Sequence, residues 1–296
     1  MSIYHRIMDL LDISIDMLIS NNIVSKPTIR SIEETIDHII NNNASVSRYG
    51  DGEFQIMVGR DISFQKASPE IKRRLEEVQI SCIPNHLVCL PDTFNGLNKK
   101  GSKQEFKKFW RAFMVKNRFK WYSYLNMKQV YYNSFISRPY MAYTDENNAK
   151  EIFIKLKKIW EHRDTIIVEG EKSRLGVGND LLDGTHSVKR ILCPSKEAFE
   201  KYNEILVEVK RYNKDCLILI ALGPTATILA YDLSLEGYQA IDIGHVDIEY
   251  EWFLMGARSK IPVKDKYVNE AGTIGGHDVG SLNDPQYLGQ IQKIIN

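Results

Sequence analysis

The chain has 296 residues, of which 43% are hydrophobic and 26% are charged, as in an ordinary globular protein. Its 39 Lys and Arg residues balance 38 Asp and Glu residues, so no overall charge attracts nucleic acid or acidic lipid. The sequence shows no apolar run of about 18 residues that would span a membrane and no recognisable signal peptide. These features predict a cytoplasmic protein with no nucleic-acid partner.

The four cysteines lack the spacing of a zinc site or of a paired-thiol motif. Cys89, Cys193 and Cys216 fall in strand-like apolar runs, where a free cysteine packs as a small hydrophobic residue. We therefore expect reduced cysteines that serve core packing.

Residues 3–19 have apolar side chains at helical spacing and an acidic polar face, which argues against docking on anionic lipid. They predict an N-terminal extension over residues 1–27, packed on the domain or on a partner, including a second copy of the chain. Residues 28–296 are expected to form one domain.

The first half of the domain predicts a helix from Thr28 to Asn42, with Ser31 and Glu34 as a capping box. Strands are expected at 44–49 and 86–90, and a helix opens at Ser68-Pro69. A second capping box, Ser102 with Glu105, predicts a helix, and residues 120–143 are interpreted as strand plus loop.

The second half alternates regularly between strands and helices. Strands are expected at 165–169, 188–193, 216–222 and 239–243. Helices are expected at 145–160, 226–236 and 244–258, and after Ser195. A glycine-rich loop, 171–180, leads into a short helix, and the tail after Ile261 is irregular. This alternation predicts an α/β fold with a Rossmann-like, doubly wound, mostly parallel sheet.

Polar and small residues follow four of the predicted strands, where ligands bind in such sheets. Asp51 and Glu53 are two carboxylates around a glycine. Hard oxygen ligands at this spacing suit Mg²⁺ or Mn²⁺, although a β-turn alone also explains them. His245 beside Asp247 offers a metal ligand or a base, or simply a structural histidine.

The loop 171–180 has features of a phosphate cradle, because Arg174 can pair with phosphate and Gly176 and Gly178 permit close backbone approach. It lacks the Rossmann and P-loop fingerprints, and a plain flexible loop is the alternative. Gly223-Pro224-Thr225 is a weaker candidate, since a tight turn and an N-cap threonine explain it without a ligand.

Four ordered motifs together resemble the GT-D-type glycosyltransferases, a bacterial family first described as a conserved domain of unknown function. The motifs are Arg48–Phe54, Glu169–Leu181, Leu222–Ala226 and Gly237–His245 continuing to Trp252, and the resemblance covers roughly residues 30–270. It implies a Rossmann-like domain, a UDP-sugar donor (with glucose as the expected sugar), a Mn²⁺ or Mg²⁺ ion and an Asp-x-Glu motif. The implied acceptor is a cell-surface glycan or glycoprotein.

With this resemblance, the expected site residues fall into three groups. The catalytic candidates are Asp51, Glu53 and Asp247; the metal candidates are Asp51, Glu53 and His245; the donor-binding candidates are Arg48, Gly50, Ser173, Arg174, Gly178, Asn179, Gly223, Pro224 and Thr225. Asp180, Asp247 and Glu249 remain unranked as general bases.

Two other functions stay open from the sequence. One is a non-catalytic nucleotide-sugar-binding subunit of a transferase complex, against which the intact carboxylates count. The other is a Rossmann-like methyltransferase or nucleotide hydrolase. A methyltransferase would place a glycine-rich loop directly after the first strand, where this chain has a carboxylate pair instead.

Overall fold

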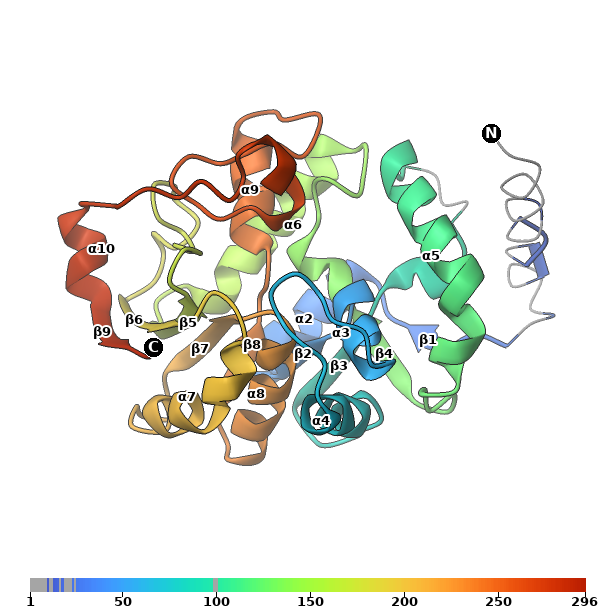
Figure 1. Cartoon of the computed structure of the whole chain (residues 1–296), viewed down its shortest axis with the longest axis horizontal. Coiled ribbons are helices and arrows are strands. Elements are labelled where there is room, and N and C mark those ends of the chain that lie inside the picture. The colour runs from blue at the N-terminus through green and yellow to red at the C-terminus, as the bar shows by residue number, and fades with distance from the viewer. Residues whose placement is uncertain (1–9, 11–12, 16, 19–22, 24, 98–100) are drawn as a thin grey trace.

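The fold is built on one nine-stranded sheet in which every neighbouring pair of strands is parallel (Figure 1). The computed structural model describes residues 10, 13–15, 17–18, 23, 25–97 and 101–296. The strand order is β1-β4-β3-β2-β8-β7-β5-β6-β9. The strands are β1 (Thr28–Ile29), β2 (Ser45–Arg48), β3 (His86–Leu90), β4 (Val130–Asn133), β5 (Asp164–Gly170), β6 (Ser187–Cys193), β7 (Leu217–Ala221), β8 (Gln239–Asp242) and β9 (Ile291–Ile294).

Helices cover both faces of the sheet, which confirms the predicted doubly wound α/β class. On one face α8 (Pro224–Leu235) packs on β2 and β8 and against α4 (Pro69–Gln79) and α7 (Tyr202–Val209). On the other face α6 (Glu146–Trp160) packs against α2 (Ile32–Asn42) and α9 (Val246–Leu254). The remaining helices are α3 (Asp51–Met57), α5 (Gln104–Tyr122) and α10 (Pro285–Gln290).

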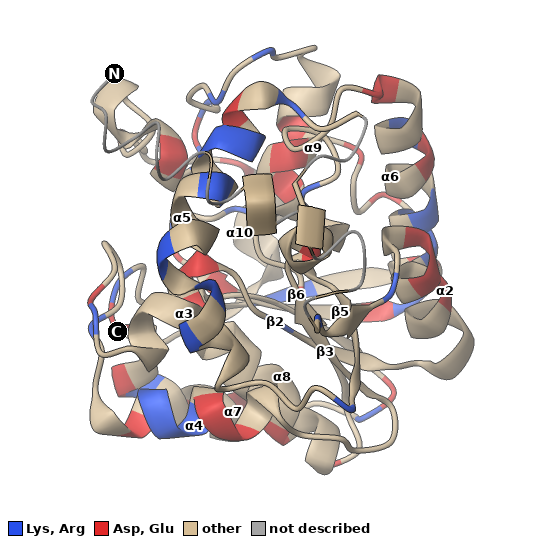
Figure 2. Ribbon diagram, turned by 90° about the vertical axis from the view of Figure 1, so that its right-hand side faces the viewer, with Lys and Arg blue, Asp and Glu red and all other residues tan. Residues whose placement is uncertain are grey.

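The core follows from the apolar runs in the sequence. Leu217, Ile218, Leu219 and Ile220 in β7 are all buried, as expected for a strand covered on both faces. Helix α8, which packs on this centre, is buried along almost its whole length, from Pro224 to Leu233. Charged residues are instead frequent in helices such as α4 and α6, while the strands between the helices carry few (Figure 2).

Several sequence predictions of helix starts are confirmed. The Ser31 and Glu34 capping box is present at the start of α2, and the Ser68 hydroxyl caps α4 ahead of Pro69. The box predicted at Ser102 is wrong, because α5 begins at Gln104 and its N-cap, Lys103, makes no side-chain capping bond.

Other elements differ from the prediction. The helix expected from Thr28 begins at Ile32 instead, and Thr28–Ile29 form β1, which pairs with β4. Residues 171–184 form turns rather than a loop and a short helix. The tail after Ile261 contains α10 and β9, and β9 joins the sheet beside β6. The helix predicted over residues 3–19 falls mostly outside the described residues.

All four cysteines are free, and Cys89 and Cys193 are buried in β3 and β6. None of the helices in the described part of the chain has the length and apolar character needed to cross a bilayer.

Because all strands are parallel, their carboxyl ends lie along one edge of the sheet, and the segments that follow β2, β5, β6, β7 and β8 meet there.

Candidate functional site

The Asp51-Gly52-Glu53 motif follows β2 and begins α3. The backbone N–H of Gly50 donates a hydrogen bond of 2.7 Å to Oε2 of Glu53, so this carboxylate closes the first turn of the helix. Burial, followed by the nearby charge of Asp242, raises the pKa of Glu53 to about 7. Glu53 therefore has a local structural task in addition to any contact with a ligand.

Arg48 is held by Asp242 at the end of β8. Its Nη2 lies 2.6 Å from Asp242 Oδ1, its Nε donates to the Asp242 carbonyl, and its Nη1 donates to the Ser137 hydroxyl. Gly244 has a φ of +48°, and a Cβ there would lie 1.9 Å from Arg48 Nη2. The guanidinium is therefore enclosed, and contact with a donor phosphate would require it to leave this pair.

Asp51 lies within electrostatic range of a group of charged side chains that the sequence did not reveal as a unit. Glu270 accepts from Arg138 at 2.7 Å through one oxygen and lies 2.6 Å from His245 Nε2 through the other. Burial raises the pKa of Asp51, and the negative charge of Glu270 adds to this while Arg138 opposes it. We call Asp51, Arg138, His245 and Glu270 the edge cluster.

The charges within the edge cluster compensate one another. Burial on its own would raise the pKa of Glu270, but His245 and Arg138 lower it well below its usual value. Glu249, buried below the cluster, accepts the backbone N–H groups of Tyr140 and Met141 at 3.0 and 2.8 Å. These bonds hold the segment that follows Arg138 in place.

The predicted set of metal ligands is not preassembled. In the ranges that the structure describes, no three His, Cys, Asp or Glu side chains gather in a group that could hold a metal ion. Glu53 is hydrogen-bonded to Gly50, and His245 is hydrogen-bonded to Glu270. Of the three predicted metal ligands, this leaves Asp51 as the carboxylate that belongs to the edge cluster. An ion at this edge would need further oxygen ligands, such as the phosphates of a substrate.

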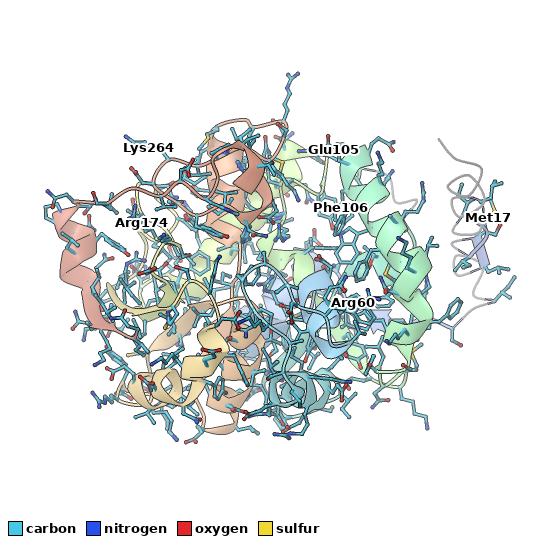
Figure 3. The ribbon with its side chains drawn as sticks, viewed as in Figure 1. Met17, Arg60, Glu105, Phe106, Arg174 and Lys264 are labelled. Atoms are coloured by element: carbon cyan, nitrogen blue, oxygen red, sulfur yellow. The ribbon has the colours of Figure 1, made fainter. Side chains whose placement is uncertain are left out.

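Arg174 points into the protein. Its Nη1 and Nη2 donate to the backbone carbonyls of Asp265 and Gly280 at 2.8 and 2.6 Å, and the residue is buried. Figure 3 shows Arg174 beneath the segment that carries Lys264. Because no helix begins after this loop, the phosphate cradle expected at 171–180 loses both Arg174 and its helix N-terminus.

The geometry predicts that Arg174→Ala loosens the segment 265–280 and lowers the free energy of unfolding by about 1–3 kcal/mol, because two carbonyls lose a charged donor. Urea denaturation measures this loss, with Arg174→Lys as a control that keeps the charge but not the planar fork. An unchanged stability together with a tenfold weaker affinity for UDP would instead restore the phosphate interpretation.

The acidic candidates for a general base are all engaged. Asp247 accepts from Asn179 through Oδ1 and pairs with buried Lys266 through Oδ2, at 2.8 and 2.7 Å. Asp180 accepts from Lys157 and from the Tyr250 hydroxyl. With Glu249 also bonded, these carboxylates hold loops together, and Asn179 is part of the same network rather than exposed toward a ligand.

The remaining predicted donor residues lie along the same edge. Gly223 has a φ of +53°, and a Cβ there would meet the Phe64 ring at 2.5 Å, so this turn lies under Phe64. Pro224 is the first residue of α8, whereas Thr225 is buried inside the first turn rather than at the N-cap. Ser173 closes a turn onto the Gly170 carbonyl.

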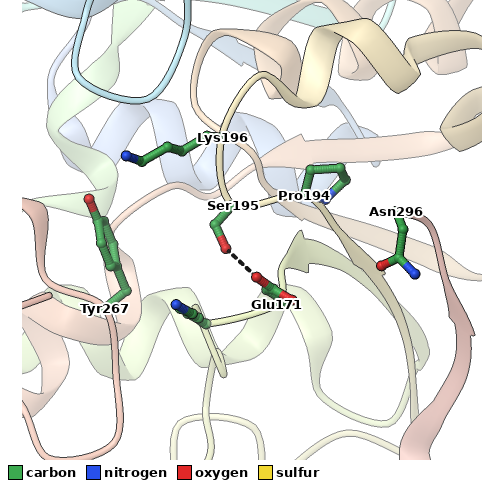
Figure 4. Close-up of a pocket in the computed structure, with 7 residues that line it drawn as sticks. Glu171, Pro194, Ser195, Lys196, Tyr267 and Asn296 are labelled. Carbon is green, nitrogen blue, oxygen red and sulfur yellow. Dashed lines mark hydrogen bonds between the residues drawn. The ribbon is translucent and has the colours of Figure 1, made fainter. Parts of the chain in front are cut away.

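A pocket of about 370 Å³ opens where β5 and β6 end (Figure 4). It is lined from four segments, by Glu171 and Lys172 after β5, by Pro194, Ser195 and Lys196 after β6, by Tyr267, and by Asn296 after β9. The Ser195 hydroxyl donates to Glu171 at 3.2 Å. The sequence predicted donor contacts at 173–179 and did not single out Lys196 or Tyr267.

A parallel sheet with charged groups and a pocket at the carboxyl ends of its strands defines a Rossmann-like, ligand-binding α/β protein. A model of the glycosyltransferase GT-D fold matches residues 46–271. The chain belongs to this family, which confirms the resemblance found in the sequence motifs.

Known proteins agree with this assignment. The chain is 40% identical over 267 residues to a probable glycosyl transferase Gly of Streptococcus gordonii, covering 89% of this chain and 38% of that protein. It is 39% identical over 285 residues to glycosyltransferase GlyD of Streptococcus pneumoniae, covering 94% and 34%. The chain thus spans about a third of the length of these relatives.

Solved structures show the same fold. One is described as a new glycosyltransferase (DUF1792) from Streptococcus sanguinis; it is 39% identical with a TM-score of 0.86, covering 92% of this chain and 100% of that one. Another is described as the highly conserved domain of unknown function 1792 with a distinct glycosyltransferase fold; it is 38% identical with a TM-score of 0.86, covering 95% and 100%.

Proposed function

We propose that the chain transfers a sugar, with glucose as the expected one, from a UDP-sugar to a hydroxyl group of a cell-surface glycan or glycoprotein, acting in the cytoplasm. The observation that carries the proposal is the edge cluster at the carboxyl edge of a GT-D sheet, in which the Arg138–Glu270 ion pair acts electrostatically on Asp51. A diphosphate leaving group needs positive charge close by. A residue that binds this group, directly or through an ion, must also have hydrogen-bonding or ligating capacity that is not already used within the protein.

Asp51 is the residue we expect to hold a Mn²⁺ or Mg²⁺ ion. Such ions are commonly bound through one or two carboxylates plus substrate phosphates, so a site with few protein ligands suits an ion that arrives with the donor. When bound, the ion would supply Lewis-acid neutralisation of the diphosphate charge. Arg138, held by Glu270, adds a fixed cation, and Glu249 keeps its segment in position.

A thermal-shift and hydrolysis assay tests the proposal without knowledge of the acceptor, because water can replace it. We expect UDP to raise the melting temperature clearly more with Mn²⁺ than with EDTA, since a ligand at 100 times its dissociation constant adds about 2.7 kcal/mol. We also expect slow, Mn²⁺-dependent hydrolysis of UDP-glucose, in preference to GDP- and dTDP-sugars.

Each other result has a distinct meaning. Equal shifts in Mn²⁺ and EDTA would contradict the metal, and the absence of any UDP effect would contradict the donor. Binding of UDP with neither hydrolysis nor transfer would favour the accessory-subunit function.

A further inference from the structure

The pocket at the ends of β5 and β6 is lined by two lysines, Lys172 and Lys196, and by one carboxylate, that of Glu171. In the part of the chain that the structure describes, no carboxylate lies within ion-pair distance of Lys172 or Lys196. Glu171, the acidic residue of the pocket, is turned to the Ser195 hydroxyl. Figure 4 shows the Lys196 ammonium and the Tyr267 hydroxyl extending toward the same opening. A concave site with unpaired cations attracts an anion, and lysine is a common phosphate ligand.

Tyr267 is fixed in the wall of this pocket. Its backbone N–H donates to the Lys172 carbonyl at 3.0 Å, and its ring stacks on His277 with 4.6 Å between centroids and 8° between planes. A ring held in this way adds aromatic surface to the pocket with little further loss of side-chain freedom. Aromatic surface beside cations is a suitable combination for a nucleotide, which has a flat base and a charged phosphate.

The pocket also lies within reach of the edge cluster. Glu270 follows Tyr267 by three residues on the same segment, and three residues span at most about 11 Å. In the sheet, β8 lies two strands from β5, and β2, which precedes Asp51, lies three strands from it, so their ends lie about 10 and about 14 Å from the end of β5. A ligand of nucleotide length therefore connects the two places along the carboxyl edge.

We propose that this pocket holds the nucleotide end of the donor, with Lys172 and Lys196 paired to its phosphate and Tyr267 beside its nucleoside. The donor then lies along the edge, with its nucleotide at β5 and β6 and its sugar toward Asp51. This orientation rests on the proposed function and adds to it by assigning Lys196 and Tyr267, which lie outside the family motifs noted in the sequence, together with Lys172, which lies within one of them.

The test compares ligand affinities of the full chain by calorimetry in the presence of Mn²⁺. We expect Lys172→Met and Lys196→Met each to raise the dissociation constant of UDP about tenfold, and the double variant about a hundredfold. Uridine, which lacks phosphate, should bind all variants alike. Lys264→Met is the matched control, because Lys264 is an exposed lysine of the segment that bears Tyr267 and lies outside the pocket (Figure 3). It should leave the UDP affinity unchanged.

The outcomes separate this inference from the function on which it rests. If the wild-type chain binds and hydrolyses UDP-glucose while the double variant binds UDP equally well, the orientation is overturned and the function stands. A raised KM for acceptor with unchanged UDP affinity would overturn it as well, and would assign the lysines to an anionic acceptor. If the wild-type chain binds no UDP, both are overturned. Both lysines are exposed, so unaltered melting temperatures are expected and a folding defect is not a competing explanation.

Discussion

Replacing Asp51 with alanine is expected to lower the turnover of UDP-glucose about 100- to 1000-fold, the usual cost of removing one group that stabilises developing charge. Asp51 follows β2 as the first residue of α3, and its carboxylate interacts electrostatically with Arg138 and Glu270. The initial rate of UDP release, with and without Mn²⁺, measures the effect. Excess Mn²⁺ should not restore the rate, because the ligand itself is missing.

Glu53 provides the matched comparison for Asp51. Glu53→Ala removes the acceptor of the Gly50 N–H bond and should cost about 1 kcal/mol of stability as well as activity, whereas Glu53→Gln keeps an acceptor oxygen. Asp51→Ala, by contrast, should leave the melting temperature nearly unchanged. Near-normal turnover in Asp51→Ala would show that the motif serves only the backbone geometry of this turn. It would contradict the proposed reaction centre.

Local patterns predict most of the fold. Alternating apolar strands and capped helices fix β2, β3, β5, β6, β7 and β8 to within about two residues, because each of these signals is contained in a short stretch of chain. Strand β9 was missed since it follows a glycine-rich segment and is exposed along much of its length, so it lacks a continuous apolar run. Its place beside β6 is set by pairing across the sheet, which no local pattern encodes.

The site was predictable only in part, for the same reason. The position of Asp51 follows from a strand exit, but its neighbours Arg138 and Glu270 come from distant segments and carry no motif of their own. Arg174 illustrates the converse error. An arginine between glycines looks the same in sequence whether it faces a ligand or, as here, two backbone carbonyls. Which of these holds depends on the fold of residues 265–280.

A buried ion pair between β5 and β6, whose ends border the pocket, gives the largest expected effect on stability. Glu169 and Arg190, from β5 and β6, lie 2.5 Å apart, and their side chains are 0% and 3% exposed. Glu169 also accepts the backbone N–H of Leu175, and Arg190 donates to the Leu175 carbonyl and to Gln290. The pair thus connects two strands, the 171–180 turn and α10.

Glu169→Ala should therefore lower the free energy of unfolding by about 3–5 kcal/mol, because it leaves a guanidinium buried without its counter-charge. This is a large part of the 5–15 kcal/mol typical of a folded domain. Urea denaturation monitored by circular dichroism measures the loss. Glu169→Gln keeps an acceptor for Leu175 and should lose less, and the double change Glu169→Leu with Arg190→Met should recover part of the loss, because it removes both charges together. A loss below about 1 kcal/mol in Glu169→Ala would show that Arg190 reaches water. The turn that carries Lys172 would then not depend on this pair for its position.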